Sequence, residues 1–135
     1  MHPGNKQRVL IVDDNPGLAE LVGLGFDREG YEVVIYTHAP DGLEQLDGTY
    51  AVVASDLDMP VMDGKEFVEE ARRRGYRGAI VVLSSNDREG ADEYLKREHG
   101  MSLDAFLGAT GAEFYQKDMD NARYVARRFK DYAPQ

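Results

Sequence analysis

Four short runs of β-branched and other apolar residues limit the fold of this chain more than any other feature. They cover residues 8–12, 32–36, 51–55 and 79–84, and a weaker run follows at 113–116. The first, third and fourth runs are almost wholly apolar, as strands covered on both faces are. Helical patterns lie between the runs. This alternation predicts an α/β fold, with a parallel sheet, helices on both of its faces and right-handed crossovers.

The helical patterns have recognisable starts and faces. Asn15 followed by Pro16 is typical of a helix N-cap and the first helical position. Apolar residues recur three and four positions apart, which places them on one face of each helix. These faces consist of Leu18, Leu21, Val22 and Phe26; Leu43 and Leu46; Phe67, Val68 and Ala71; and Ala122, Val125, Ala126, Phe129 and Tyr132.

The segment between the fourth and fifth strands, residues 85–111, is too long for one connection. It contains two helical stripes separated by Gly100. The stripes are Ala91, Tyr94 and Leu95, and Leu103, Phe106 and Leu107. We therefore predict two helices here, and an insertion within residues 86–110.

The composition bounds the class of protein. At 135 residues, we expect one domain over residues 1–135, with frayed ends at 1–6 and 133–135. The absence of cysteine excludes disulfides and thiolate chemistry. The apolar runs are too short to span a bilayer, and the first residues lack the apolar segment of a signal peptide, so we expect a cytoplasmic protein without membrane contact. The net charge of −9 argues against direct nucleic-acid binding.

Charged and hydroxyl side chains follow the strands at the points where they end. Asp13 and Asp14 follow the first strand, Asp56 the third, Ser84 ends the fourth, and Lys117 follows the fifth. The carboxyl ends of parallel strands share one edge of the sheet, where ligands bind. Crowded carboxylates require either a raised pKa or a cation, and Mg²⁺ prefers such oxygen ligands. A lysine and a hydroxyl beside them predict phosphoryl transfer to a carboxylate.

Four motifs in order resemble the receiver domains of two-component response regulators. They are "VDDNP", "DLDMPVMDG", the hydroxyl after "VVL", and the aromatic residue three positions before the lysine in "GAEFYQK". The resemblance covers residues 7–132. It implies a CheY-like, doubly wound sheet of five strands in the order 2-1-3-4-5.

The resemblance implies roles for the acidic residues. Asp56 matches the aspartate that is phosphorylated, and Asp14 matches the direct Mg²⁺ ligand. Asp13 matches the acid that holds the metal through water, and the backbone carbonyl of Asp58 completes the metal shell. Near these residues, we read Gly64 as a position that permits an unusual backbone conformation.

The resemblance also implies roles for three residues on the fourth and fifth strands. Ser84 matches the switch hydroxyl, Lys117 the lysine that binds the phosphate, and Phe114 the aromatic residue that changes rotamer with Ser84. The spacing before the lysine leaves Tyr115 open as an alternative to Phe114.

The sequence departs from the family in two places. Asp118 stands where a proline usually follows the lysine, so we expect a trans peptide bond and a different entry to the last helix. The segment between Ser84 and Lys117 is longer than usual. This insertion falls in the region through which the family docks its partners, and it puts the usual docking mode in doubt.

Other polar residues have plainer interpretations. We read Asp63 as a residue that caps the loop before the third helix, and not as a ligand. His2, His38 and His99 have no partner at metal-binding spacing and are expected on the surface.

The sequence supports one function and leaves two alternatives. The first is a phosphorylation switch that receives a phosphoryl group from a sensor histidine kinase or phosphotransfer protein and signals to a downstream effector protein. Such a domain catalyses only its own phosphorylation and dephosphorylation. The second is a pseudo-receiver that binds partners without phosphorylation, and the third is a haloacid-dehalogenase-like phosphatase, for which "DLD" offers a nucleophile motif. The order of the motifs and the short chain argue against the phosphatase.

Overall fold

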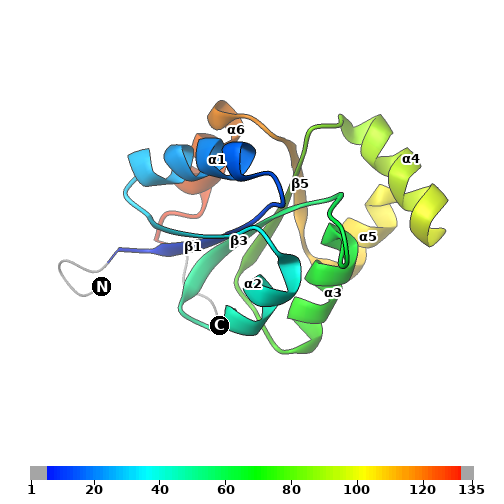
Figure 1. Cartoon of the computed structure of the whole chain (residues 1–135), viewed down its shortest axis with the longest axis horizontal. Helices are drawn as coiled ribbons and strands as arrows, with labels where there is room; N and C mark the ends of the chain where they lie inside the picture. Colours follow the sequence, from blue (N-terminus) through cyan, green and yellow to red (C-terminus); the bar gives the residue numbers. More distant parts are fainter. Residues whose placement is uncertain (1–5, 132–135) are drawn as a thin grey trace.

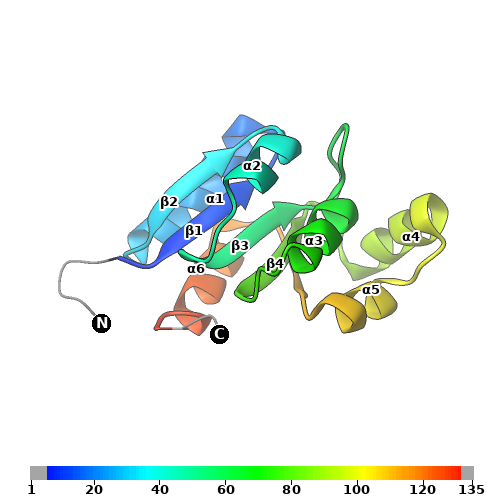
Figure 2. The same ribbon diagram turned by 90° about the horizontal axis from the view of Figure 1, so that it is seen from below.

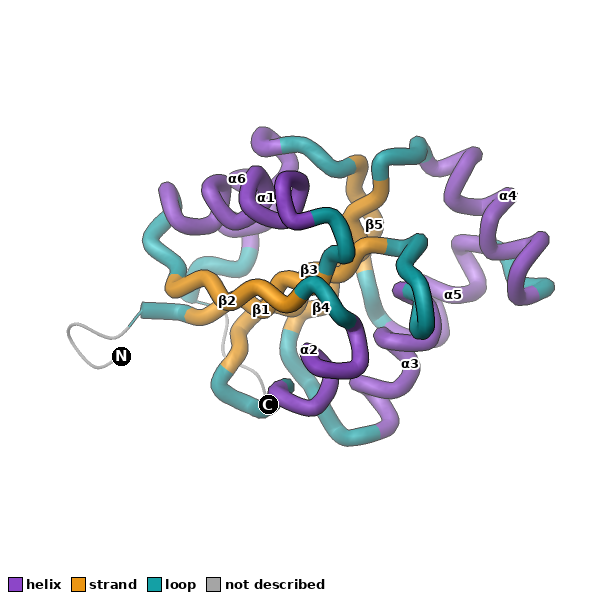
Figure 3. The backbone as a smooth tube through the Cα atoms, in the orientation of Figure 1, coloured by secondary structure: helices purple, strands orange, loops and turns teal. Residues whose placement is uncertain are grey.

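The five predicted strands form one parallel sheet in the computed structural model, which describes residues 6–131 (Figures 1 and 3). The strand order is β2-β1-β3-β4-β5, so the predicted α/β class and the order 2-1-3-4-5 are confirmed. The elements in chain order are β1 (Arg8–Val12), α1 (Pro16–Arg28), β2 (Glu32–Tyr36), α2 (Ala39–Gln45), β3 (Tyr50–Asp56), α3 (Gly64–Arg73), β4 (Ala79–Ser84), α4 (Arg88–His99), α5 (Leu103–Thr110), β5 (Glu113–Gln116) and α6 (Met119–Arg128).

Helices cover both faces of the sheet, as the apolar strands require. Helices α1 and α6 pack on one face, and α2, α3 and α5 lie on the other (Figures 1 and 2). Successive residues of the central strands alternate between two buried clusters: Val9 and Ile11 face α1 and α6, and Leu10 and Val12 face α2 and α3. The carboxyl ends of the strands are therefore fixed from both sides.

The long connection between β4 and β5 holds two helices, as predicted. Helix α4 ends at Gly100, whose φ of 65° places it in the left-handed region that glycine tolerates. Ser102 caps α5 by accepting from the backbone N–H of Ala105. The backbone N–H of Leu103 donates to the Asp92 carboxylate over 2.8 Å, which joins the start of α5 to α4.

Helix α1 starts as the sequence predicts and packs closely on α6. The Asn15 side chain accepts from the backbone N–H of Leu18 at 3.1 Å. Gly25 faces α6, where an added Cβ would lie 2.8 Å from the Cβ of Ala122 and 3.2 Å from the carbonyl oxygen of Met119. The absent side chain thus lets the two helices approach.

A few sequence predictions lie outside the described part of the chain. They concern His2, Tyr132, and almost all of the ends expected to be frayed. Within residues 6–131, every helix is too short or too polar to cross a bilayer.

We expect Gly25→Ala to destabilise the protein by about 1–3 kcal/mol, because the new methyl group overpacks the α1–α6 contact. Gly108→Ala is the matched control, since Gly108 lies in α5 with nothing within 4 Å of an added Cβ. That variant should gain up to about 1 kcal/mol from helix propensity. Urea unfolding of both variants measures the difference, and equal gains would contradict the close approach of the helices.

Candidate functional site

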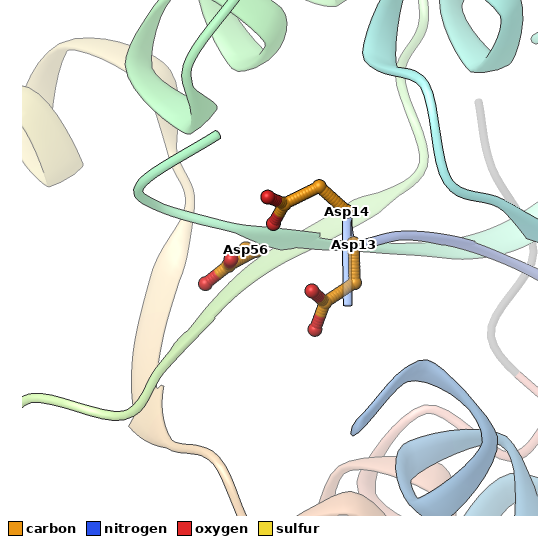
Figure 4. Close-up of side chains that lie close together, drawn as sticks. All are labelled: Asp13, Asp14 and Asp56. Carbon is orange, nitrogen blue, oxygen red and sulfur yellow. The ribbon is translucent and has the colours of Figure 1, made fainter. Parts of the chain in front are cut away.

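Three carboxylates converge at the carboxyl edge of the sheet. Val12 pairs with Ser55 across β1 and β3, so the next residues lie side by side: Asp13 directly follows β1, and Asp56 is the last residue of β3. Asp13, Asp14 and Asp56 each offer an oxygen, and these oxygens lie within 4.8 Å of one another (Figure 4). The strand register therefore produces the acidic cluster that the sequence predicts.

Lys117 reaches the same cluster from the end of β5. Its Nζ lies 2.7 Å from Oδ2 of Asp13 and 3.0 Å from Oδ1 of Asp56, and its side chain is 3% exposed. Its backbone N–H donates to the carbonyl oxygen of Ser84 over 2.7 Å, which fixes the lysine against the end of β4. A single buried cation thus joins residues from β1 and β3.

Burial and charge shift the pKa values of the central pair. Burial is the largest cause that raises the pKa of Asp56, to about 6; Lys117 lowers it, and the charge of Asp13 raises it further. Burial by itself lowers the pKa of Lys117, but its contacts with Asp13 and Asp56 outweigh that effect and leave the pKa raised. Lys117 is therefore a cation at neutral pH. The ionisation of Asp56 costs more free energy in the folded protein than in water.

The hydrogen bonds distinguish the oxygens of the cluster. Oδ1 of Asp13 accepts from the backbone N–H of Asn15 at 3.0 Å, and its Oδ2 contacts Lys117. Oδ1 of Asp56 accepts from Lys117 and from the backbone N–H of Leu57 at 2.9 Å. Asp14 is exposed. The three carboxylates form a set of hard oxygen donors that fits a divalent cation such as Mg²⁺, with Asp14 as the most accessible ligand.

Ser84 and Phe114 lie on the same face of the sheet. Phe114 pairs with Val82 and Gln116 pairs with Ser84, so the side chains of Phe114 and Ser84 are two positions apart on neighbouring strands. Ser84 is buried, and its Oγ accepts from the backbone N–H of Asn86 at 3.1 Å. Phe114 is half-buried. This register places Phe114 on the same face as the predicted switch hydroxyl.

Tyr115 points to the opposite face. It pairs with Leu83 and packs against the cluster under α1 and α6. Its hydroxyl donates to Glu113 at 2.7 Å, and its ring lies 5.8 Å from that of Tyr124. The alternative that placed Tyr115 beside Ser84 is therefore not the arrangement found.

The loop after β3 corrects one interpretation of the sequence. Gly64 does not have a positive φ; glycine is required there because an added Cβ would lie 2.2 Å from the carbonyl oxygen of Asp56. The unusual backbone belongs to Val61, whose φ is 72°. A β-branched residue in that region is strained. Asp58 is exposed in the same loop, two residues beyond Asp56.

Asp118, the residue after Lys117, begins α6 as predicted from the absence of a proline at this position. The peptide bonds of residues 6–131 are all trans. Asp118 is the N-cap of α6, and its side chain accepts from the backbone N–H of Asn121 at 2.6 Å. The Asn121 side chain donates back to the carbonyl oxygen of Gln116 at 2.8 Å, which closes the turn after β5.

The histidine and capping predictions have mixed outcomes. His38 is exposed, as expected, and Asp63 caps α3. His99 was expected on the surface, and that prediction is wrong. Its side chain is 18% exposed, and its Nε2 lies 2.5 Å from Oδ2 of Asp63. Sequence spacing offers no signal for this contact, because the partners are 36 residues apart in different helical regions.

Comparisons with known proteins identify the class that this fold and site define. Residues 9–104 match the family model of the response regulator receiver domain. The chain therefore belongs to the receiver domains of two-component response regulators. The third strand, the acidic cluster and all of the first strand except Arg8 lie within the matched range.

Individual relatives agree with this assignment. The transcriptional regulatory protein QseB of Escherichia coli O157:H7 is 31% identical over 98 residues, which are 65% of this chain and 45% of QseB. The chain thus spans less than half the length of that relative. A sensor protein from Polaromonas sp. JS666 is 29% identical, with a TM-score of 0.70, over 93% of this chain and 96% of that one. The response regulator TrrA of Thermotoga maritima, solved with Mg²⁺ and beryllofluoride, shares the fold with a TM-score of 0.71 and 22% identity, over 91% of this chain and 98% of that one.

The raised pKa of Asp56 predicts a pH-dependent difference between the wild type and Asp56→Asn. The folded-state value of about 6 exceeds the roughly 3.9 of an unfolded aspartate. The folded state therefore favours the protonated carboxyl of Asp56. This contribution to the free energy of unfolding is fully present below about pH 4 and is lost as the pH rises through about 6. Asparagine cannot ionise. Without Mg²⁺, the free energy of unfolding of Asp56→Asn should therefore rise by about 2–3 kcal/mol relative to that of the wild type as the pH increases from about 4 to about 7.5.

Urea unfolding across this pH range measures the effect. Asp27→Asn, at an exposed position of α1, is the control and should show little change with pH. Added Mg²⁺ should reduce the advantage of Asp56→Asn, because a bound cation offsets the charge of Asp56. A difference that does not vary with pH would contradict the cost assigned to the ionised carboxylate.

Proposed function

We propose that this chain is a phosphoacceptor switch that receives a phosphoryl group on Asp56 from a sensor histidine kinase or a phosphotransfer protein. The observation that carries the proposal is the meeting of Lys117 with Asp13 and Asp56 at one edge of the sheet, beside Asp14. Nucleophile, cation and metal-binding acids are thus within reach of one phosphoryl group. Membership of the receiver family supports the same reading.

The chain's own residues suit Mg²⁺ as the cofactor. Asp14 and Asp56 would bind it through their carboxylates and Asp13 through water, and family resemblance adds the backbone carbonyl of Asp58. When bound, the cation neutralises negative charge on the carboxylates and on the incoming phosphoryl oxygens. Lys117 supplies the second positive charge, and its burial keeps that charge in one place.

The proposed transfer is a displacement at phosphorus. An oxygen of Asp56 forms the new O–P bond, while the bond from phosphorus to the donor atom breaks and its electron pair leaves with the donor. A protonated histidine donor leaves as neutral imidazole, and Asp56 becomes an acyl phosphate. Oδ1 of Asp56 is held by Lys117 and the Leu57 N–H, which makes Oδ2 the oxygen suited to attack.

The output of the switch would pass through a change of structure. In the family, the hydroxyl at the position of Ser84 and the aromatic residue at that of Phe114 respond to the phosphoryl group. Their common face in this sheet supports the same roles here. Such a change shifts a two-state equilibrium, and a downstream effector protein reads the favoured state.

One observation favours the pseudo-receiver as a second candidate. The ion pairs of Lys117 by themselves offset part of the charge of Asp13 and Asp56. A receiver that never takes a phosphoryl group would be held together by the same contacts. The two candidates differ in whether Asp56 accepts phosphate.

We expect Asp56→Asn to abolish the incorporation of acid-labile phosphate from a small phosphodonor such as acetyl phosphate with Mg²⁺, because the nucleophile is removed. Asp58→Asn should still be phosphorylated and change only the lifetime of the product, since that exposed side chain lies two residues beyond the acceptor. Intact-mass spectrometry and acid lability measure both results.

The same assay separates the other functions. Incorporation that persists in Asp56→Asn would refute the assignment of the acceptor. A wild type that takes up no phosphate would favour the pseudo-receiver. Sustained hydrolysis of a generic phosphomonoester, well beyond one turnover per chain, would favour the phosphatase.

A further inference from the structure

Asp63 joins two parts of the molecule with one carboxylate. Its Oδ1 accepts from the backbone N–H of Glu66 at 3.0 Å, and the Glu66 side chain accepts from the backbone N–H of Asp63, which closes a capping box on α3. Its Oδ2 accepts from the hydroxyl of Tyr94 at 2.8 Å and lies 2.5 Å from Nε2 of His99. Both of these partners belong to α4. The start of α3 is thus tied to the inserted helix.

Because Asp63 is buried, breaking its contact with α4 would cost free energy. The Asp63 side chain is 8% exposed, and that of His99 is 18% exposed. A buried carboxylate that loses its donors carries a large penalty, so α4 cannot leave without cost to Asp63. Ala91 and Leu95 also pack α4 on the core, and both are fully buried. The carboxylate adds polar contacts in the C-terminal half of α4 to this apolar packing.

The loop of residues 57–63, between Asp56 and α3, is held by close backbone contacts. The backbone N–H of Gly64 donates to the carbonyl oxygen of Leu57 over 2.7 Å, and Gly64 has no room for a Cβ beside Asp56. Val61, within the loop, is held at a φ of 72°. Strain of this kind persists only where the surrounding structure imposes it. Asp56 and Asp63 are therefore joined by close backbone contacts at Gly64.

Charge also connects the acceptor loop to α4. Burial is the largest cause of the raised pKa of Tyr94; its hydrogen bond to Asp63 comes next, and the charges of Asp58 and Glu98 add to it. Asp58 thus acts electrostatically on the tyrosine that binds Asp63. A cation bound near Asp58 would offset part of the negative charge that acts on Tyr94.

We propose that the contact of Asp63 with Tyr94 and His99 is a latch that couples the occupancy of the acceptor site to the order of α4. The proposal rests on the proposed function, because the occupant is Mg²⁺ with a phosphoryl group. Filling the site removes the repulsion among its carboxylates and fixes the loop of residues 57–63 in the conformation that presents Asp63 to α4. The inserted helix thereby becomes a readout of the site.

The test uses Mg²⁺ with beryllofluoride as the probe, in place of the phosphoryl group. Fluorine NMR of the bound beryllofluoride reports occupancy, and hydrogen–deuterium exchange reports the order of residues 88–99. We expect occupancy to slow exchange in this segment of the wild type by about fivefold or more, the lower end of usual couplings. This measurement needs no variant.

Two variants test the latch itself. Tyr94→Phe removes one hydroxyl, and Tyr94→Phe with His99→Leu removes both donors. Linkage is reciprocal, so the variants should lose the slowing of exchange and bind Mg²⁺–beryllofluoride more weakly by a similar factor. Tyr124→Phe and His38→Gln, at exposed positions, are matched controls that should do neither. A contact with a merely structural role would not change the affinity for the probe.

The outcomes separate the latch from the proposed function. A wild type that shows no bound beryllofluoride signal defeats the proposed function and the latch with it. Bound probe with unchanged exchange over residues 88–99 defeats the latch alone. Tyr94→Phe is the conservative variant and decides the reciprocal test if the double variant fails to fold; an affinity equal to that of the wild type would overturn the proposal.

Discussion

The buried ion pairs of Lys117 are the interaction on which the rest of this structure depends. A lysine side chain that is 3% exposed is tolerated because two carboxylates surround it, and each carboxylate is tolerated because the lysine is there. The three residues lie at the ends of three different strands: Asp13 directly follows β1, Asp56 ends β3 and Lys117 directly follows β5. Their meeting therefore requires the parallel sheet, its strand order and its register at once. A shift of one residue in the register of any of these strands would leave a buried charge without its partner.

The same edge of the sheet explains why the loop after β3 is so tightly built. Asp56 ends the strand, and the next helix returns so closely that Gly64 has no room for a Cβ. The intervening turn is completed by a strained Val61. Strain at this place is retained because the ends of the loop are both fixed, one by Lys117 and the other by the Asp63 cap. Site chemistry and helix capping are thus parts of one rigid unit.

The sequence was sufficient for features that depend on local pattern and on the edge rule for parallel sheets. It predicted the strands, the two helices within residues 86–110, the acidic cluster, and the place of Lys117 beside it. It was insufficient where the answer depends on tertiary register. The choice between Phe114 and Tyr115 follows from the pairing of β5 with β4, which spacing alone leaves open. The partner of His99 lies 36 residues away, beyond any periodic pattern.

Helix α4 shows how tertiary contacts hold a long connection in place. Extra residues in a connection cost little loop entropy, so the length of the segment between β4 and β5 has little effect on stability by itself. What matters is how α4 packs. Tyr94 lies on the apolar stripe that the sequence predicts, and its ring packs against the core while its hydroxyl reaches Asp63. An amphipathic side chain of this kind gains apolar burial and satisfies a buried carboxylate in a single contact. Helix α4 is thus joined to the N-terminus of α3 through Tyr94, which periodicity places correctly but whose hydroxyl partner it cannot assign.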